Sequence, residues 1–93
     1  MREYDLVAII DPEVDEEGIS EITDKISKFI SDRGGVVDRV DNWGKRRLAY
    51  PVKKFMEGNY MSTRFKLEVG LIKEFEAEVR ALGNVLRYLV VKV

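Results

Sequence analysis

The spacing of hydrophobic residues along this chain changes twice from alternation to a helical period and back. Residues 3–10 alternate, which places every second side chain on one face of a predicted strand. Hydrophobic residues in 19–30 then recur with the period of an amphipathic helix. Alternation returns through 36–69, a second helical period spans 72–82, and residues 85–93 predict a last strand. The expected order is therefore strand, helix, two strands, helix and strand.

Few topologies satisfy this order of elements. Right-handed crossovers place both helices on one face of a four-stranded antiparallel sheet. This predicts an α+β fold, the ferredoxin-like βαββαβ sandwich, with the first and third strands in the centre. Pro51 lacks a backbone N–H, so the second strand is expected at an edge. The length of 93 residues allows one hydrophobic core, and a single domain over 1–93 is expected.

Local signals predict where the elements begin and end. Asp15 is placed to cap the first helix, and Gly34 with Gly35 suits its end. Gly44 interrupts the second strand where the alternation changes phase, which predicts a β-bulge. A loop over 53–58 is expected before the third strand. Alternation along that strand should place two sets of side chains on opposite faces: Met61, Thr63, Phe65, Leu67 and Val69 on one, and Tyr60, Ser62, Arg64 and Lys66 on the other.

Cysteine and histidine are both absent. Their absence excludes disulfides, thiolate metal sites, thiol nucleophiles and the commonest general base, which argues against an enzyme. The carboxylates in 11–17 lack the spacing of an EF-hand loop and fit helix capping better. No glycine-rich phosphate loop and no G-x-S-x-G turn occurs, so no cofactor, metal or small-molecule substrate is expected. The longest apolar run, Leu6–Ile10, is too short for a membrane span, and a soluble, cytoplasmic chain is expected.

A formal net charge of -1 conceals a strong asymmetry. Residues 1–32 hold 3 basic and 10 acidic side chains, whereas residues 33–66 hold 9 basic and 3 acidic ones. Five of these cations fall within ten residues: Lys45, Arg46, Arg47, Lys53 and Lys54. Such a cluster fits a nucleic-acid patch and a solvated surface about equally well. Composition alone leaves both interpretations open.

One face of the predicted sheet carries no helix. Val7, Ile9, Leu89 and Val91 are expected to point out from it, because their neighbours in sequence point to the helices. Four outward aliphatic side chains exceed a normal scattering and favour a protein partner or self-association. A shift of the face assignment by one residue would bury them instead. Tyr60 alone is available there for base stacking, which is a poor match to RNA-recognition motifs.

The segment 42–53, with the sequence NWGKRRLAYPVK, closely resembles the signature of the bacterial small-subunit ribosomal protein six family. Met1–Tyr4 resembles the opening of that family, and Asn84–Val85, Arg87 and Val90–Lys92 resemble its end. The resemblance therefore covers essentially the whole chain. It implies a ferredoxin-like fold, binding to the central domain of small-subunit ribosomal RNA, and a heterodimer with small-subunit ribosomal protein eighteen. It also implies a noncatalytic, ribosome-associated protein of the cytoplasm.

The basic residues carry the RNA-binding role that the resemblance implies. They are Arg2, Lys45, Arg46, Arg47, Lys53, Lys54 and Arg87. The pattern of outward residues predicts the contacts with a protein partner, which are Val7, Ile9, Tyr60, Leu89 and Val91. Arg46 and Arg47 are neighbours on a strand and must point to opposite sides, so we expect them to have different roles.

Other functions occur on the same fold. An acylphosphatase-type enzyme would need a phosphate-binding loop with an arginine after the first strand, whereas residues 11–18 are acidic and would repel phosphate. An RNA-recognition-motif-like domain would need further exposed aromatic residues on the third strand. An effector-binding regulatory domain would be recognised by a small molecule that raises its melting temperature.

Overall fold

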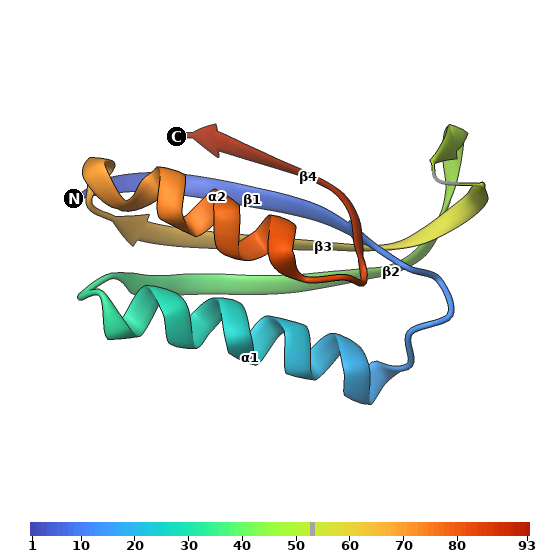
Figure 1. Cartoon of the computed structure of the whole chain (residues 1–93), viewed down its shortest axis with the longest axis horizontal. Coiled ribbons are helices and arrows are strands. Elements are labelled where there is room, and N and C mark those ends of the chain that lie inside the picture. Colours follow the sequence, from blue (N-terminus) through green and yellow to red (C-terminus); the bar gives the residue numbers. More distant parts are fainter. Residues whose placement is uncertain (53) are drawn as a thin grey trace.

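Four antiparallel strands form a single sheet in the computed structural model of this chain, which describes residues 1–52 and 54–93 (Figure 1). The elements in chain order are β1 (Arg2–Ile10), α1 (Glu16–Asp32), β2 (Val36–Val52), β3 (Phe55–Leu67), a 3-10 helix (Val69–Leu71), α2 (Ile72–Ala81) and β4 (Val85–Lys92). The strand order in the sheet is β2-β3-β1-β4. The predicted ferredoxin-like topology is therefore confirmed, with Pro51 in an edge strand.

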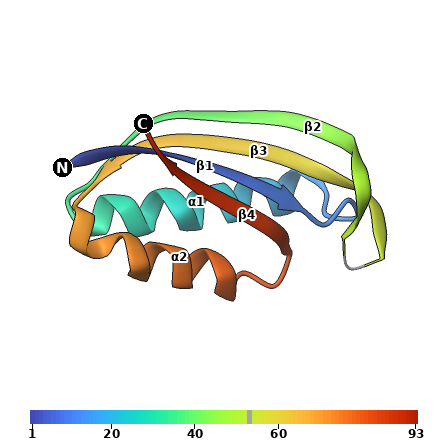
Figure 2. The same ribbon diagram turned by 90° about the horizontal axis from the view of Figure 1, so that it is seen from above.

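The sheet and the helices form two layers. Figure 2 shows α1 and α2 together on one side of the strands, which leaves the other face of the sheet without a helix. We call this uncovered side the open face. The chain termini lie at one end of the sheet, where the Val93 backbone N–H donates to the Glu3 carbonyl at 2.9 Å. The opposite end of the sheet is where β2 and β3 meet.

Helix α1 begins and ends where the sequence predicts. The Asp15 side chain accepts a hydrogen bond from the Gly18 backbone N–H at 2.8 Å, which makes Asp15 the N-cap. The helix ends at Asp32, and Gly34 follows with a positive φ of 76°. Glycine adopts this left-handed conformation without a steric penalty, so the chain can leave the helix and enter β2.

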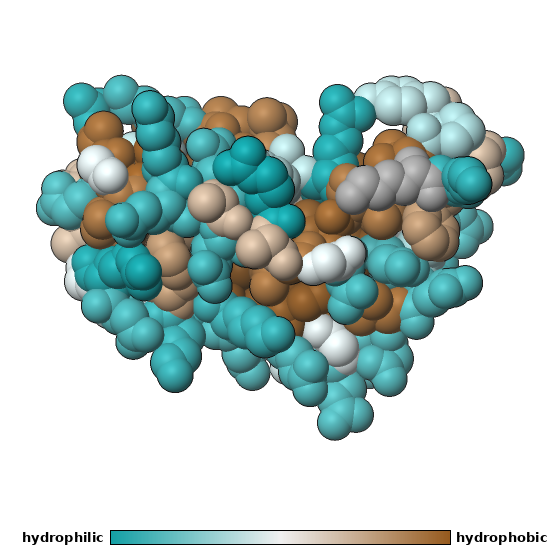
Figure 3. Space-filling view, in the orientation of Figure 1, coloured by the Kyte–Doolittle hydropathy of each residue, from teal (hydrophilic) through white to brown (hydrophobic). Residues whose placement is uncertain are grey.

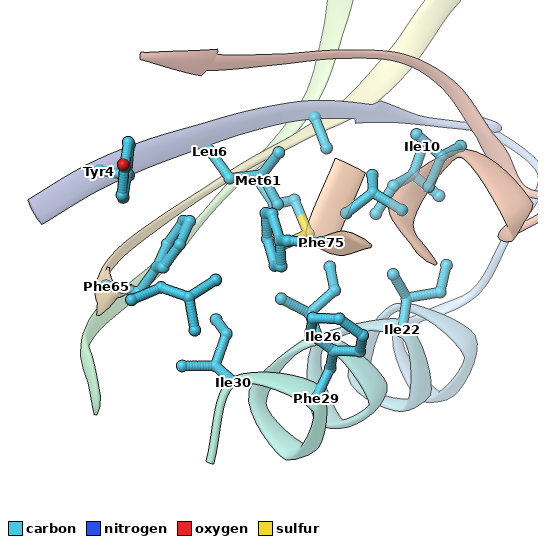
Figure 4. Packing of buried hydrophobic residues seen from close by; sticks show 14 of the residues in the cluster. Tyr4, Leu6, Ile10, Ile22, Ile26, Phe29, Ile30, Met61, Phe65 and Phe75 are labelled. Atoms are coloured by element: carbon cyan, nitrogen blue, oxygen red, sulfur yellow. The ribbon is translucent and has the colours of Figure 1, made fainter. Parts of the chain in front are cut away.

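The hydrophobic core lies between the helices and the sheet (Figure 4). The hydrophobic residues at helical spacing in α1 are all buried: Ile19, Ile22, Ile26, Phe29 and Ile30. Phe65 of β3 has its ring centroid 4.6 Å from that of Phe75 and 5.7 Å from that of Tyr4. Full burial of side chains of this size contributes about 1.5–3 kcal/mol each before the loss of chain entropy is subtracted. The hydrophobic residues of the helices and those of the strands thus pack together in one core.

Two expectations about β3 are wrong. The strand begins at Phe55, because Val52 of β2 already pairs with Phe55, so most of the predicted loop over 53–58 is strand. Val69 is 54% exposed in the 3-10 helix, whereas the sequence predicts it inside β3 on the same face as Met61 and Phe65, which are buried. The Glu68 carbonyl accepts a hydrogen bond from the backbone N–H three residues later at 3.0 Å, and this turn ends the strand early.

One buried hydroxyl of the core is unsatisfied among the described residues. The Oγ1 atom of Thr63, on β3, has no hydrogen-bond partner there, and such a group costs about 1–3 kcal/mol. We therefore expect Thr63→Val, which keeps the shape, to raise the free energy of unfolding in urea by about 1 kcal/mol. Thr23→Val is the matched control, because the Thr23 hydroxyl donates to the Ile19 carbonyl at 3.0 Å, and it should not stabilise. A Thr63→Val protein less stable than the wild type would contradict the prediction.

Candidate functional site

The second half of the β2–β3 hairpin bends out of the plane of the sheet. Figures 1 and 2 show the end of the hairpin passing the helices and turning toward the side of β4. The bend follows a bulge at Gly44, where the pairing register shifts and φ is 80°. The Asn42 side-chain oxygen accepts a hydrogen bond from the Gly44 N–H at 3.0 Å and holds the bulge. The bulge predicted from the change of alternation is therefore confirmed.

The basic triplet after the bulge divides between the two faces of the hairpin. Arg46 pairs with Gly58, and a Cβ atom added to Gly58 would lie 2.3 Å from Cγ2 of Ile9, an outward residue of β1. Paired residues share a face, so Arg46 lies on the open face. Lys45 and Arg47 flank it in sequence and lie on the opposite face. The prediction that Arg46 and Arg47 point to opposite sides is confirmed.

The cations of the middle segment differ in their ion pairs. Arg64 donates two hydrogen bonds to the Asp5 carboxylate, at 3.0 and 2.8 Å, and Lys66 lies 3.8 Å from Asp38. The hairpin cations, in contrast, form no salt bridge within residues 1–52 and 54–93: Lys45, Arg46, Arg47 and Lys54. The uncompensated positive charge of the middle segment is therefore concentrated on the hairpin.

The ion pair between Arg64 and Asp5 makes stability depend on pH. Its hydrogen bond, more than its charge, lowers the pKa of Asp5 below the ordinary value. A carboxyl group with a lowered pKa in the folded state stabilises the fold above its unfolded pKa of about 3.9, and this contribution is lost as the pH falls through the folded pKa. We expect Asp5→Asn to lower the melting temperature at pH 7 and to match the wild type in strong acid. Arg64→Gln should give the same profile, and a difference that stays constant from pH 7 to pH 2 would contradict the assignment.

The aliphatic residues expected to point outward do so. Leu89 is 60% exposed and Val91 45% exposed, while Val7 and Ile9 are half-buried between their neighbours on the open face. Val7, Ile9 and Leu89 line a groove of ≈ 370 Å³ that reaches Tyr50 of the hairpin. The predicted face assignment is confirmed, and the open face offers an apolar surface to a partner.

A contact that sequence reasoning missed joins the hairpin to β4. The guanidinium group of Arg87 lies over the Tyr50 ring, 5.6 Å from its centroid, and its Nη1 atom donates to the Tyr50 hydroxyl. Leu48 is buried under the same bend and lines a small cavity together with Ile9 and Tyr60. No local signal in the sequence could reveal this contact, because Tyr50 and Arg87 lie on opposite edge strands of the sheet.

A second aromatic residue joins Tyr60 at the open face. The Trp43 ring stacks on the Tyr60 ring, with centroids 6.2 Å apart and planes 9° from parallel. Trp43 is 47% exposed and is the chain's single tryptophan. Sequence reasoning placed Tyr60 alone here, because alternation does not show that the bulge at Gly44 brings Trp43 beside Tyr60. The indole is a built-in fluorescent probe of whatever covers this part of the face.

The remaining predicted RNA contacts are not gathered in one place. Lys54 is exposed at the end of the hairpin with a positive φ of 72°, and Lys53 lies outside the described residues. Arg2 is exposed at the start of β1, opposite Leu67, whereas Ile10 at the other end of that strand lies near the hairpin. At about 3.3 Å per residue the strand separates Arg2 from the hairpin by roughly 26 Å. The hairpin cations therefore form one group, and Arg2 stands apart from it.

The helix side of the molecule differs from the open face. Figure 3 shows hydrophilic residues over most of this side, with smaller hydrophobic areas between them. Among the carboxylates in 11–17, Asp15 accepts the Gly18 N–H at 2.8 Å as the N-cap of α1, so the predicted capping role is confirmed for this residue. Asp11 accepts the Glu13 N–H at 2.8 Å in the turn before the helix. None of the helices among the described residues is both long and apolar enough to cross a membrane.

These elements define a small α+β protein of the ferredoxin-like class, with an open sheet face and a basic hairpin at one end of it. Comparison with known families gives a match to ribosomal protein S6 over residues 3–92. The chain belongs to the ribosomal protein S6 family. The family resemblance of the sequence is thereby confirmed.

Relatives of known identity resemble the chain over nearly its full length. Small ribosomal subunit protein bS6 of Clostridium botulinum (strain 657 / Type Ba4) is 42% identical over 91 residues, which cover 98% of this chain and 97% of the relative. The bS6 protein of Moorella thermoacetica is 38% identical over 92 residues, covering 99% and 94%. The crystal structure of 30S ribosomal protein S6 from Thermotoga maritima superposes with a TM-score of 0.92 at 31% identity, covering 99% of this chain and 87% of that one.

Membership of this family defines the role of the chain in outline. It is a structural component of the small ribosomal subunit, and so a noncatalytic protein of the cytoplasm that associates with ribosomal RNA. The enzymatic alternative on the same fold is thereby excluded.

Proposed function

We propose that this chain binds the central domain of small-subunit ribosomal RNA together with small-subunit ribosomal protein eighteen. The observation that carries the proposal is the separation of two surfaces of different composition. The hairpin carries cations that form no ion pair among the described residues. The open face carries aliphatic side chains. Phosphate groups are bound by cations, whereas an apolar protein surface is bound by apolar side chains. Because the two surfaces are separate, one small domain can bind both partners at once.

The hairpin is the proposed RNA side. Arginine binds phosphate through two parallel N–H groups, and a hairpin on a rigid sheet holds such groups in a fixed direction. Lys45 and Arg47 share the hairpin face that points away from the open face, and they are the proposed phosphate contacts, with Lys54 at the end of the hairpin. Lys53, the residue before Lys54 in the sequence, stays a predicted contact. Arg2 contributes as a separate contact from the other end of β1.

The open face is the proposed protein side. It offers Val7, Ile9, Leu89 and Val91 as an apolar patch, and Tyr60 with the stacked Trp43 ring as its aromatic border. Arg46 lies on this face and is the proposed polar contact at its rim. Covering the patch with ribosomal protein eighteen would remove apolar area from water, at about 25 cal/mol for each Å².

Binding to a central-domain RNA fragment tests the proposal. We expect the chain and ribosomal protein eighteen together to bind the labelled fragment at least tenfold more tightly than either protein alone, because each orders a surface for the other. A fragment of equal length from another ribosomal RNA domain serves as the control. Two proteins that do not associate, and that bind the fragment no better together than singly, would overturn the proposal.

A further inference from the structure

Arg87 occupies an unusual position for an RNA-binding cation. It lies on β4 and pairs with Ile9 of β1, on the open face, whereas Lys45, Arg46, Arg47 and Lys54 lie on the hairpin formed by β2 and β3. Its guanidinium group contacts the Tyr50 ring and hydroxyl of β2, with β3 and β1 lying between these two strands in the sheet. The contact therefore ties one edge of the sheet to the other across the open face.

Few other contacts hold the end of the hairpin in place. It extends past both helices, so the core beneath the sheet does not reach it (Figure 1). Leu48 is the one buried residue of β2. The pairing register between β2 and β3 also shifts between Arg47 and Val52, so the ladder is irregular where the bend occurs. The direction of the hairpin thus depends on few contacts besides that of Tyr50 with Arg87.

We propose that Arg87 is a positioning residue that latches the hairpin through Tyr50 and so fixes the direction of the cations before it in β2. The side chain then acts on RNA binding through Tyr50 and makes no contact with phosphate itself. This consequence for RNA rests on the proposed function, whereas the latch itself is a property of the free protein. It replaces the direct RNA contact that the family resemblance implies for Arg87.

The chemistry of the contact favours an arginine. The guanidinium group is planar, so it can lie over an aromatic ring and donate an N–H to the ring hydroxyl at its edge. The ammonium group of lysine keeps the charge but offers neither the plane nor the fork of donors. The latch is therefore weakened in Arg87→Lys and lost in Arg87→Leu, which has neither charge nor donor, whereas a contact with phosphate by charge would largely survive the change to lysine.

A distance measurement in the free protein tests the latch. The chain has no cysteine, so spin labels attach only to introduced cysteines, at Met56 on the hairpin and Lys73 on α2, both exposed. We expect one narrow distance distribution in the otherwise unchanged protein, and a broad or displaced one in Arg87→Leu and in Tyr50→Leu. Arg80→Leu, the same change on α2, is the control and should leave the distribution narrow. An unchanged distribution in Arg87→Leu would overturn the latch.

RNA affinity measured with ribosomal protein eighteen present tests its consequence. We expect Arg87→Leu to weaken binding about tenfold, to leave the salt dependence unchanged, and to add nothing in a Tyr50→Leu background, since both changes break the same contact. A direct phosphate contact would instead give additive effects, and Arg87→Ala would lower the log–log salt slope by about 0.9. That result would overturn the positioning role. If the unchanged protein fails to bind the RNA, the proposed function fails, and the distance measurement still decides the latch.

Discussion

Gly35→Ala should destabilise the fold by about 3 kcal/mol, at the upper end of the cost of overpacking a closed site. A Cβ atom at this position would lie 2.5 Å from the Lys66 backbone carbonyl oxygen and 2.7 Å from Cγ2 of Ile30. The backbone contact cannot be relieved by a change of rotamer, so the connection between α1 and β2 would have to move away from β3. For a domain with a total stability of about 5–14 kcal/mol this is a large fraction.

The neighbouring glycine is the matched control. A Cβ atom on Gly34 meets nothing within 4 Å, and its cost comes from a positive φ alone, about 1–2 kcal/mol. Thermal unfolding separates the two changes, because each kcal/mol lowers the melting temperature of such a domain by about 4–8 °C. Equal losses in Gly34→Ala and Gly35→Ala would contradict the close approach of α1 and β3 at Gly35.

Val7→Lys should weaken the complex with ribosomal protein eighteen about 100-fold and leave the fold near intact. Val7 lies half-buried in the middle of the open face, between Ser62 of β3 and Leu89 of β4. In the free protein a lysine there can lead its ammonium group into water, whereas a partner covering the face would bury the charge. Isothermal titration calorimetry with the purified partner measures the loss of affinity.

Val69→Lys provides the comparison for this experiment. Val69 is an exposed valine in the 3-10 helix that precedes α2, away from the open face, so its replacement should leave partner affinity unchanged. If both variants bind the partner as the wild type does, the open face is not the protein side. If Val7→Lys unfolds the chain, the half-buried valine is part of the fold and the surface must be tested at Leu89.

Much of this fold is predictable from the sequence because its elements depend on local signals. Burial in α1 follows the helical period from Ile19 to Ile30, and Asp15 and Gly34 determine the ends of that helix through hydrogen bonding and backbone freedom. Pro51 marks the edge strand because it lacks the backbone N–H that a central strand needs. The topology then follows, since right-handed crossovers leave few ways to connect these elements.

The parts that sequence reasoning missed depend on contacts between distant residues. The early end of β3 at Leu67 is determined by the turn into α2, and alternation of side chains continues through Val69 regardless. The stack of Trp43 on Tyr60 and the contact of Tyr50 with Arg87 depend on how far the bulge bends the hairpin. A bulge can be predicted from its glycine, but the angle that it imposes cannot.

The face assignment of the arginine pair is the point at which structure adds most to the sequence. Alternation alone shows that Arg46 and Arg47 point to opposite sides. The pairing of Arg46 with Gly58, which packs against Ile9, shows which of the two shares the open face. The roles proposed for them follow from this: Arg47 contacts RNA phosphate, and Arg46 lies at the rim of the protein surface.

Affinity for the central-domain RNA, measured over a range of salt concentrations with ribosomal protein eighteen present, tests this division of surfaces most directly. We predict that Arg47→Ala weakens binding and lowers the log–log salt slope by about 0.9, the value for one phosphate contact on duplex nucleic acid. Arg46→Ala should leave that slope unchanged and weaken the complex of the two proteins. Lys28→Ala removes a cation from α1, on the helix side, and should change neither the affinity for RNA nor the salt slope. Unchanged affinity and slope in both arginine variants would remove the triplet from the RNA site and leave the hairpin as a solvated charged surface.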